Sequence, residues 1–200
     1  MTAGLIITLV KLISGANVRW QGCSPETRQR IYFANHTSHL DVAVLWSALP
    51  SEVRALTRPV AAKDYWIKGK LRPYLAAKVF NAVLIEREKI SAHDNPIDHL
   101  VEALGQKNSL IIFPEGGRNL SGETGVFKSG IYHLAKRRPD VELVPVLIDN
   151  LNRILPKGEV LAVPLLSSIS FGAPINLLAD ESKKDFLERA RSAVLNLRNV

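Results

Sequence analysis

The sequence predicts a single α/β domain in which a mostly parallel central sheet is flanked by helices. The chain has 200 residues, enough for one domain with a sizeable core. Its composition, 46% hydrophobic and 22% charged, is that of a folded globular protein. Short apolar runs alternate with segments of helical periodicity, and several runs lack polar alternation, as expected for a sheet covered on both faces. We find no internal repeat or linker and expect one continuous domain over residues 1–200.

The expected elements follow from these patterns. Strands are expected at 31–34, 53–61, 82–85, 109–113 and 142–148, and helices at 39–48, 64–79, 95–104, 126–137 and 183–197. The helix at 95–104 is the best defined, because Asn95 can cap it, Pro96 suits its first turn and Gly105 can end it. Folds of this class place their chemistry where the carboxyl ends of strands meet helix starts, so the loops after the strands are the places to search.

The first 16 residues, MTAGLIITLVKLISGA, form an apolar segment that precedes the expected strands and helices. The segment is shorter than the roughly 20 apolar residues that span a bilayer. Three interpretations remain open: a helix lying in a membrane interface, a helix buried against the domain, and a removed signal peptide. We carry the interfacial helix forward as the expectation for 1–16.

The charge balance narrows the class of partner. Twenty-six basic and 19 acidic residues give a net charge of +7, which favours an anionic partner such as a phosphorylated substrate or a membrane surface. Nucleic acid is not expected, because the basic residues are scattered and no zinc-finger spacing, aromatic RNA-binding strand or basic arm is found. A single cysteine, Cys23, excludes an internal disulfide and indicates a reducing compartment.

The segment NHTSHLD, residues 35–41, has two compatible interpretations. Ser38 and Asp41 fit a capping box at the start of a helix. Alternatively, one Asp41 oxygen could hold one imidazole nitrogen of His36 and leave the other nitrogen free as a general base. Because a carboxylate has two oxygens, we expect Asp41 to serve both purposes. His39 is placed on the helix without a role.

A metal site is the competing interpretation of the same segment. His36, His39 and Asp41 are residue types that bind metals. The remaining histidines are His93, His99 and His133, and each is expected in an exposed loop or a helix. No second cluster therefore supplies the further ligands of a zinc site. We therefore expect no metal.

Two further loops follow predicted strands. Arg87 comes directly after the run NAVLIE and is either a surface residue or a guanidinium that grips a phosphate with two parallel hydrogen bonds. The segment FPEGGRN, followed by FKSG, could cradle an anion through its glycines and cations, although it lacks the spacing of a nucleotide P-loop and could be an ordinary glycine turn. Its candidate residues are Glu115, Gly116, Gly117, Arg118 and Lys128.

Four segments, taken in order, resemble the motifs of the glycerolipid acyltransferases, the family of 1-acylglycerol-3-phosphate and glycerol-3-phosphate acyltransferases. The segments are NHTSHLD, LIER, FPEGGRN with FKSG, and VPVLI. The resemblance runs from about residue 31 to 148 and continues more weakly in ISFGAPI. It implies that His36 deprotonates the acceptor hydroxyl with Asp41 as its partner. It also implies that Arg87, Glu115 and Gly116 serve the acceptor and that Pro145 lies near the acyl donor or chain. The sequence departs from the family pattern at Asn81, where glycine is usual, and at Gly117, where threonine is frequent.

The implied activity is transfer of a fatty acyl group from acyl-CoA or acyl-carrier protein to lysophosphatidic acid, giving phosphatidic acid in phospholipid synthesis without a bound cofactor. The implied location is the cytoplasmic face of the cell membrane. The segment KDYWIKGKLRPY, residues 63–74, has the composition of a membrane-facing surface and equally that of a helix packed on the sheet with its lysines in water. Three alternatives remain: an acyltransferase for another acceptor (glycerol 3-phosphate, a lysophospholipid or an acylated amino acid), a non-catalytic lipid-binding module, and a metallohydrolase.

Overall fold

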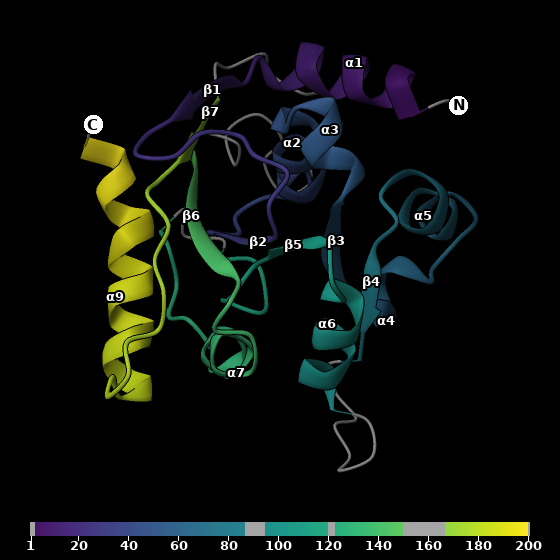
Figure 1. Ribbon diagram of the computed structural model, residues 1–200. Coiled ribbons are helices and arrows are strands. Elements are labelled where there is room, and N and C mark those ends of the chain that lie inside the picture. Colours follow the sequence, from purple (N-terminus) through teal and green to yellow (C-terminus); the bar gives the residue numbers. More distant parts are fainter. Residues whose placement is uncertain (1–2, 87–94, 120–122, 150–166, 200) are drawn as a thin grey trace.

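A computed structural model describes residues 3–86, 95–119, 123–149 and 167–199 (Figure 1). A seven-stranded sheet runs through its centre in the order β1-β7-β6-β2-β5-β3-β4. The strands are β1 (Asn17–Trp20), β2 (Arg30–Ala34), β3 (Thr57–Ala62), β4 (Val83–Ile85), β5 (Ser109–Ile112), β6 (Glu142–Asp149) and β7 (Ser168–Phe171). The five strands from β6 to β4 are mutually parallel, whereas β7 is antiparallel to β6 and parallel to β1. The predicted α/β fold with a mostly parallel sheet is confirmed.

Strand β2 is the centre of the sheet. All five of its residues are buried, and it pairs with β5 on one side and β6 on the other, with Phe33 opposite Ile112 and Pro145. A strand buried on both faces needs a continuous apolar run, which is why the segment following Arg30 was recognisable from sequence. The side chain of Arg30 is buried at the start of the strand, where its Nε donates to Glu142 at 2.9 Å.

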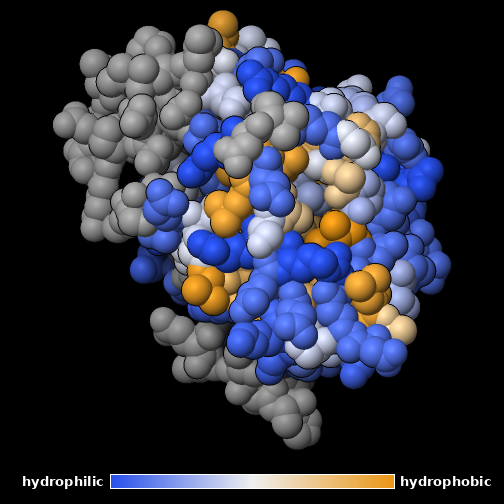
Figure 2. All heavy atoms as spheres, turned by 90° about the vertical axis from the view of Figure 1, so that its left-hand side faces the viewer, coloured by the Kyte–Doolittle hydropathy of each residue, from blue (hydrophilic) through white to orange (hydrophobic). Residues whose placement is uncertain are grey.

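Helices cover both faces of the sheet (Figure 1). One layer contains α1 (Ala3–Ser14), α2 (Asp41–Ala48) and α3 (Ser51–Ala55), followed by α4 (Lys63–Trp66), α5 (Leu71–Tyr74) and the π-helical turn η1 (Leu75–Val79). The other layer contains α6 (Pro96–Leu104), α7 (Gly130–Arg137), α9 (Lys183–Asn196) and the short 3-10 turn η2 (Leu197–Asn199). Helix α9 buries Phe186, Ala190 and Val194, and Figure 2, viewed from the α9 side, shows a surface where hydrophilic side chains predominate and apolar ones are interspersed.

The N-terminal helix α1 packs one face on the domain and leaves the other outside. Ile6 is buried in the core layer, and Ile7 and Val10 pack against it. Leu5, Leu9 and Leu12 are 57%, 49% and 74% exposed. Within the described residues, every helix is too short or too polar to cross a bilayer.

Three predicted elements were wrong in extent. The strand expected at 53–61 is divided into helix α3 and strand β3, because its first residues complete a short helix before Thr57. The helix expected at 64–79 is broken into α4, α5 and η1, with Gly69 between the first two at φ +73°, outside the helical region. The helix expected at 126–137 begins only at Gly130. Strand β1, at one edge of the sheet, and its neighbour β7 were missed. Strand β1 (NVRW) has no buried residue and β7 (SISF) alternates serine with apolar residues, so neither gives a continuous apolar run.

Candidate functional site

The candidate site lies at the edge of the sheet where the parallel strands end. The loops after β2, β3, β4 and β5 meet there around a cavity of about 560 Å³, within the usual size of small-molecule sites. Its apolar lining includes Val42, Val60, Ala61, Ala62, Trp66, Ile85, Ile97, Ile112, Phe113 and Ile131, and its polar lining includes His36, His39, Tyr65, Glu86, Arg118, Lys128 and His133. An elongated apolar group and an anionic group can both be accommodated by such a lining.

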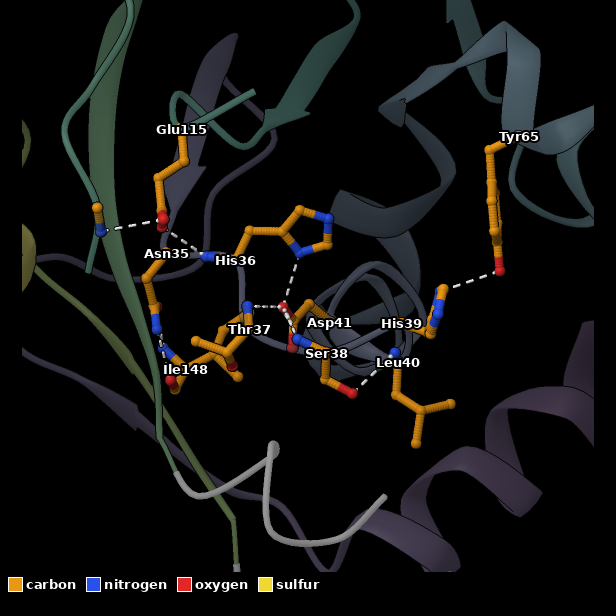
Figure 3. Close-up of polar contacts among 11 residues, drawn as sticks. Asn35, His36, Thr37, Ser38, His39, Leu40, Asp41, Tyr65, Glu115 and Ile148 are labelled. Carbon is orange, nitrogen blue, oxygen red and sulfur yellow. Dashed lines mark hydrogen bonds and ion pairs between the residues drawn. The ribbon is translucent and has the colours of Figure 1, made fainter. Parts of the chain in front are cut away.

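His36 and Asp41 form a hydrogen-bonded pair at this cavity (Figure 3). His36 follows directly after β2, and its Nδ1 lies 2.8 Å from Asp41 Oδ2 in the first turn of α2. The ring stacks on Phe113 with centroids 4.3 Å apart. Because Asp41 is fully buried and holds Nδ1, the ring is oriented with Nε2 directed away from the carboxylate. This arrangement suits a histidine that exchanges a proton at Nε2.

The carboxylate of Asp41 is used differently from the sequence prediction. A single oxygen, Oδ2, accepts the Nδ1 contact and the backbone N–H groups of Thr37 at 2.7 Å and Ser38 at 2.8 Å. The other oxygen, Oδ1, is buried and has no hydrogen-bond partner within the described parts of the chain. The expected division of tasks between the two oxygens was therefore wrong.

The expected capping box is only half formed. Asp41 reaches back to the Ser38 N–H, but Ser38 Oγ accepts from Leu40 N at 3.2 Å. Helix α2 begins at Asp41, so Ser38 is not its N-cap. The buried negative charge at the start of α2 is favourable because it lies at the positive end of the helix dipole.

Glu115 holds the backbone of His36 in place through a hydrogen bond. Oε1 accepts from the backbone N–H of His36 at 2.8 Å, and Oε2 accepts from the backbone N–H of Gly125 at 3.0 Å. Burial raises the pKa of the Glu115 carboxyl, and these two hydrogen bonds oppose the rise. Both oxygens of Glu115 are thus engaged by the chain itself.

Asn35, the residue before His36, anchors the end of β2 to β6. Its Nδ2 donates to the Ile148 carbonyl at 2.8 Å, and its Oδ1 accepts from the Ile148 N–H at 2.8 Å. A buried side-chain amide here replaces a backbone peptide and continues the strand pairing by one step. An asparagine directly after an apolar strand was the available signal.

His39 precedes helix α2, contrary to the prediction that it lies on the helix. Its ring stacks on Tyr65, and its Nδ1 lies 3.0 Å from the Tyr65 hydroxyl. Arg72 also lies over the Tyr65 ring, with its guanidinium carbon 4.3 Å from the ring centroid. Burial lowers the pKa of His39, and Arg118 and His36 act in the same direction.

The glycine loop brings its cations to the same cavity. Gly116 has φ +68°, and a side chain added there would meet Lys128 Nζ at 2.9 Å, so the lysine lies close against the backbone. Gly116, Gly117, Arg118 and Lys128 all line the cavity with His36, as predicted for one site. Gly117 faces open space, with no atom within 4 Å of an added Cβ.

The remaining predicted residues lie elsewhere. Arg87 is outside the described residues. Pro145 is buried within β6 and does not line the cavity. A Cβ added at Gly172 would lie 3.0 Å from its Cγ. Asn81 adopts φ +47°, a conformation that glycine reaches without strain and asparagine tolerates better than most residues, so the departure from the family pattern preserves the backbone shape.

The same side chains do not form a metal-binding cluster within the described residues. In the part of the chain that the structure describes, no three histidine, cysteine, aspartate or glutamate residues gather closely enough to hold a metal ion. His39 and Asp41 direct their nearest polar contacts to Tyr65 and to His36 with the backbone, respectively.

The fold, the order of the loops and the paired histidine and aspartate define an acyltransferase domain. The chain belongs to the Acyltransferase family, whose model matches residues 16–149. The resemblance to glycerolipid acyltransferases inferred from the motifs is confirmed.

Curated relatives point in the same direction. The chain is 30% identical over 170 residues to a 1-acyl-sn-glycerol-3-phosphate acyltransferase of Limnanthes douglasii, covering 84% of this chain and 58% of the relative. It is 25% identical over 158 residues to the human 1-acyl-sn-glycerol-3-phosphate acyltransferase alpha, covering 78% of this chain and 53% of that protein. The chain thus spans between half and three-fifths of the length of these relatives.

A solved structure shares the fold. The crystal structure of the 1-acyl-sn-glycerophosphate (LPA) acyltransferase PlsC from Thermotoga maritima matches with a TM-score of 0.76 at 19% identity. The match covers 98% of this chain and 78% of that one. At this identity it supports the architecture of the domain alone.

Proposed function

We propose that this protein transfers a fatty acyl group from an acyl thioester to the free hydroxyl of lysophosphatidic acid, giving phosphatidic acid. The observation that carries the proposal is the His36–Asp41 contact of 2.8 Å at a cavity that combines cations with an apolar wall. The names of the relatives support the choice of acceptor.

The chemistry requires no nucleophile from the enzyme, because a thioester is already activated. His36 Nε2 takes the hydroxyl proton as the acceptor oxygen forms a bond to the thioester carbonyl carbon. The tetrahedral intermediate then collapses, the carbon–sulfur bond breaks, and the imidazolium returns the proton to the leaving thiolate. Asp41 fixes the tautomer and stabilises the imidazolium.

The cavity lining supports this substrate class. Arg118 and Lys128 supply positive charge for the phosphate of the acceptor, while residues such as Val60, Ile85 and Ile112 provide an apolar surface for a lipid chain. Arg87 completes the phosphate contact in this proposal. The acyl donor is acyl-CoA or acyl-carrier protein, and no bound cofactor takes part.

We also propose that α1 lies in the membrane interface on the cytoplasmic side of the cell membrane. Its exposed Leu5, Leu9 and Leu12 form the apolar face that would contact lipid. Replacing all three by serine should abolish co-flotation with anionic phospholipid vesicles, whereas serine at the exposed Leu178 should not. Equal flotation of the two variants would remove α1 from the proposal.

The central test is acyl transfer to lysophosphatidic acid, measured as thiol release and labelled product. His36→Ala should lower kcat by about 10²–10⁴-fold, the usual contribution of a positioned base. His99→Ala, on the exposed side of α6, is the matched control and should keep wild-type turnover. Full turnover by a folded His36→Ala variant would exclude the mechanism.

The acceptor is tested with the same assay. A panel of lysophosphatidic acid, glycerol 3-phosphate, a lysophospholipid and an acylated amino acid should show preference for the first. Arg87→Ala should raise the KM for that acceptor and leave an unphosphorylated acceptor unaffected. Wild-type protein that turns over none of the panel would refute the proposed acyl transfer and favour the non-catalytic lipid-binding module.

A further inference from the structure

Helix α9 contacts the glycine loop through one arginine. Arg191 Nε lies 3.1 Å and its NH2 group 2.7 Å from the carbonyl oxygen of Thr124. Nε also lies 3.0 Å from the carbonyl oxygen of Gly125. The guanidinium thus holds two consecutive carbonyls of a segment 66 residues earlier in the chain.

The other end of the same peptide group reaches the site. The Thr124 carbonyl and the Gly125 N–H belong to one peptide plane, and this N–H donates to Glu115 Oε2 at 3.0 Å. A cation on the carbonyl polarises the peptide and strengthens the hydrogen bond that its N–H donates. The second oxygen of Glu115 accepts from the His36 N–H at 2.8 Å (Figure 3). One continuous line of contacts therefore joins Arg191 to the backbone of the proposed base.

The environment of this line is buried and closely packed. Glu115 is 8% exposed and Thr124 is 2% exposed. A Cβ at Gly125 would lie 2.7 Å from Glu115 Oε2, so the peptide approaches the carboxylate as closely as a glycine allows. With so little free space, movement of the 124–125 peptide must displace Glu115 or leave its oxygen without a partner.

We infer that Arg191 is a positioning residue for the acyl transfer proposed above: by holding the 124–125 peptide it fixes Glu115, which fixes the backbone of His36. The inference rests on the proposed function. Arg191 lies outside the residues that the family model matches, 16–149, so family membership does not assign it this role.

A neighbouring arginine on the same helix provides the matched control. Arg189 binds Glu181 at 2.6 Å and donates to the Asn176 carbonyl at 2.8 Å. It has the same side chain, a comparable number of polar contacts and a place on α9, but its partners lie away from the 124–125 peptide.

The experiment is a double-mutant cycle on kcat with Arg191→Ala and Glu115→Gln, with Arg189→Ala measured in parallel. Arg191→Ala should lower kcat about tenfold, leave both KM values within about twofold, and lower Tm no more than Arg189→Ala does. In the Glu115→Gln background the same substitution should change kcat less than twofold, because the line of contacts is already broken. Arg191→Lys, which keeps the charge and one donor, should recover part of the loss and serves as the cycle variant if the alanine variant does not fold.

Three results would overturn the inference. The first is wild-type kcat in folded Arg191→Ala. The second is an equal fold-loss from Arg191→Ala in the wild-type and Glu115→Gln backgrounds, since a general structural role has no reason to depend on Glu115. The third is a fold-loss in Arg189→Ala equal to that in Arg191→Ala. A wild-type protein without acyl transfer would instead refute the proposed function, so the two failures are distinguishable.

Discussion

The loop after β2 and the loop after β5 both connect a parallel strand to a helix at the cavity, but they are held in different ways. In the first, three contacts come from one side chain at the helix start: Asp41 binds His36, Thr37 and Ser38, all within five residues of itself, and Glu115 adds one distant contact to the His36 N–H. In the second, Gly125 is joined to Glu115 within the loop, and Arg191 on α9 holds the carbonyls of Thr124 and Gly125 from outside it.

The difference follows from loop length. The six-residue connection from β2 to α2, residues 35–40, can be organised by one carboxylate that accepts several N–H groups, as at a helix start. The connection from β5 to α7 is about three times longer, and its ordering cost must be offset by contacts from other elements. We therefore expect changes in the first loop to affect chemistry directly and changes in the second to act through geometry.

The largest effect is expected from Asp41→Asn. The amide oxygen can take the place of Oδ2 and accept the same backbone N–H groups, so the free energy of unfolding should fall by only about 1 kcal/mol. The lost charge no longer stabilises the imidazolium, and kcat should fall about 10²–10⁴-fold. Asp140→Asn, at an exposed ion pair with Arg138, should change neither quantity appreciably. An Asp41→Asn variant that loses most of its stability but keeps kcat would contradict the expectation that the first loop acts on the chemistry directly.

A smaller effect is expected from Gly125→Ala in the long loop. The added Cβ meets Glu115 Oε2 at 2.7 Å and must push the carboxylate away. We expect kcat to fall roughly tenfold through displacement of the His36 backbone. Steady-state kinetics at saturating acceptor measures this. Gly4→Ala, where the added Cβ meets open space, is the control glycine replacement and should keep the wild-type kcat. Unchanged kcat in Gly125→Ala would mean that the long loop does not position the base.

The pH dependence of stability distinguishes the two loops further. The folded-state pKa of Glu115 is raised by burial, so the folded protein binds more protons than the unfolded chain just above the ordinary glutamate pKa of about 4.3. Stability contributed by this group is present at low pH and is lost as pH rises through the folded pKa. Relative to Glu115→Gln, the wild-type free energy of unfolding should therefore fall as pH rises through this window. Urea unfolding of both proteins at several pH values measures the trend. A wild-type free energy of unfolding that rises with pH relative to that of Glu115→Gln would contradict it.

The smallest effect is expected from Gly117→Thr, which restores the residue frequent in the family. The position is exposed and open, so the free energy of unfolding should change by less than about 0.5 kcal/mol. Chemical denaturation measures this directly. A loss above about 1 kcal/mol would show that the long loop requires glycine at both positions of its turn.

Much of the fold was predictable because its signals are local. The buried runs that became β2, β5 and β6 and the capped helix α6 were recognised, and Asn95 does accept from the Ile97 N–H at 3.0 Å. The segment from Lys63 to Val79 was not predicted correctly, because its apolar residues have helical spacing while Gly69 interrupts the backbone. A periodic pattern does not show where a helix breaks into turns.

The site divides in the same way. The pairing of His36 with Asp41 was predictable from six residues of sequence, and its geometry is as expected except for the use of one oxygen. Glu115 was recognised as important, but its hydrogen bond to the His36 backbone was not foreseen. Arg191 gave no signal, because nothing in α9 indicates a contact with a peptide so distant in sequence.

The bond between Asn35 and Ile148 has a consequence for the order of folding. It joins positions 113 residues apart, and β2 also depends on neighbours that are synthesised much later than itself. Such non-local pairings form slowly, since loop closure precedes the gain from contact. A nascent or partly folded chain in which β6 has not yet paired with β2 would therefore lack an oriented His36. We expect catalytic activity to appear with the last cooperative step of folding rather than in stages.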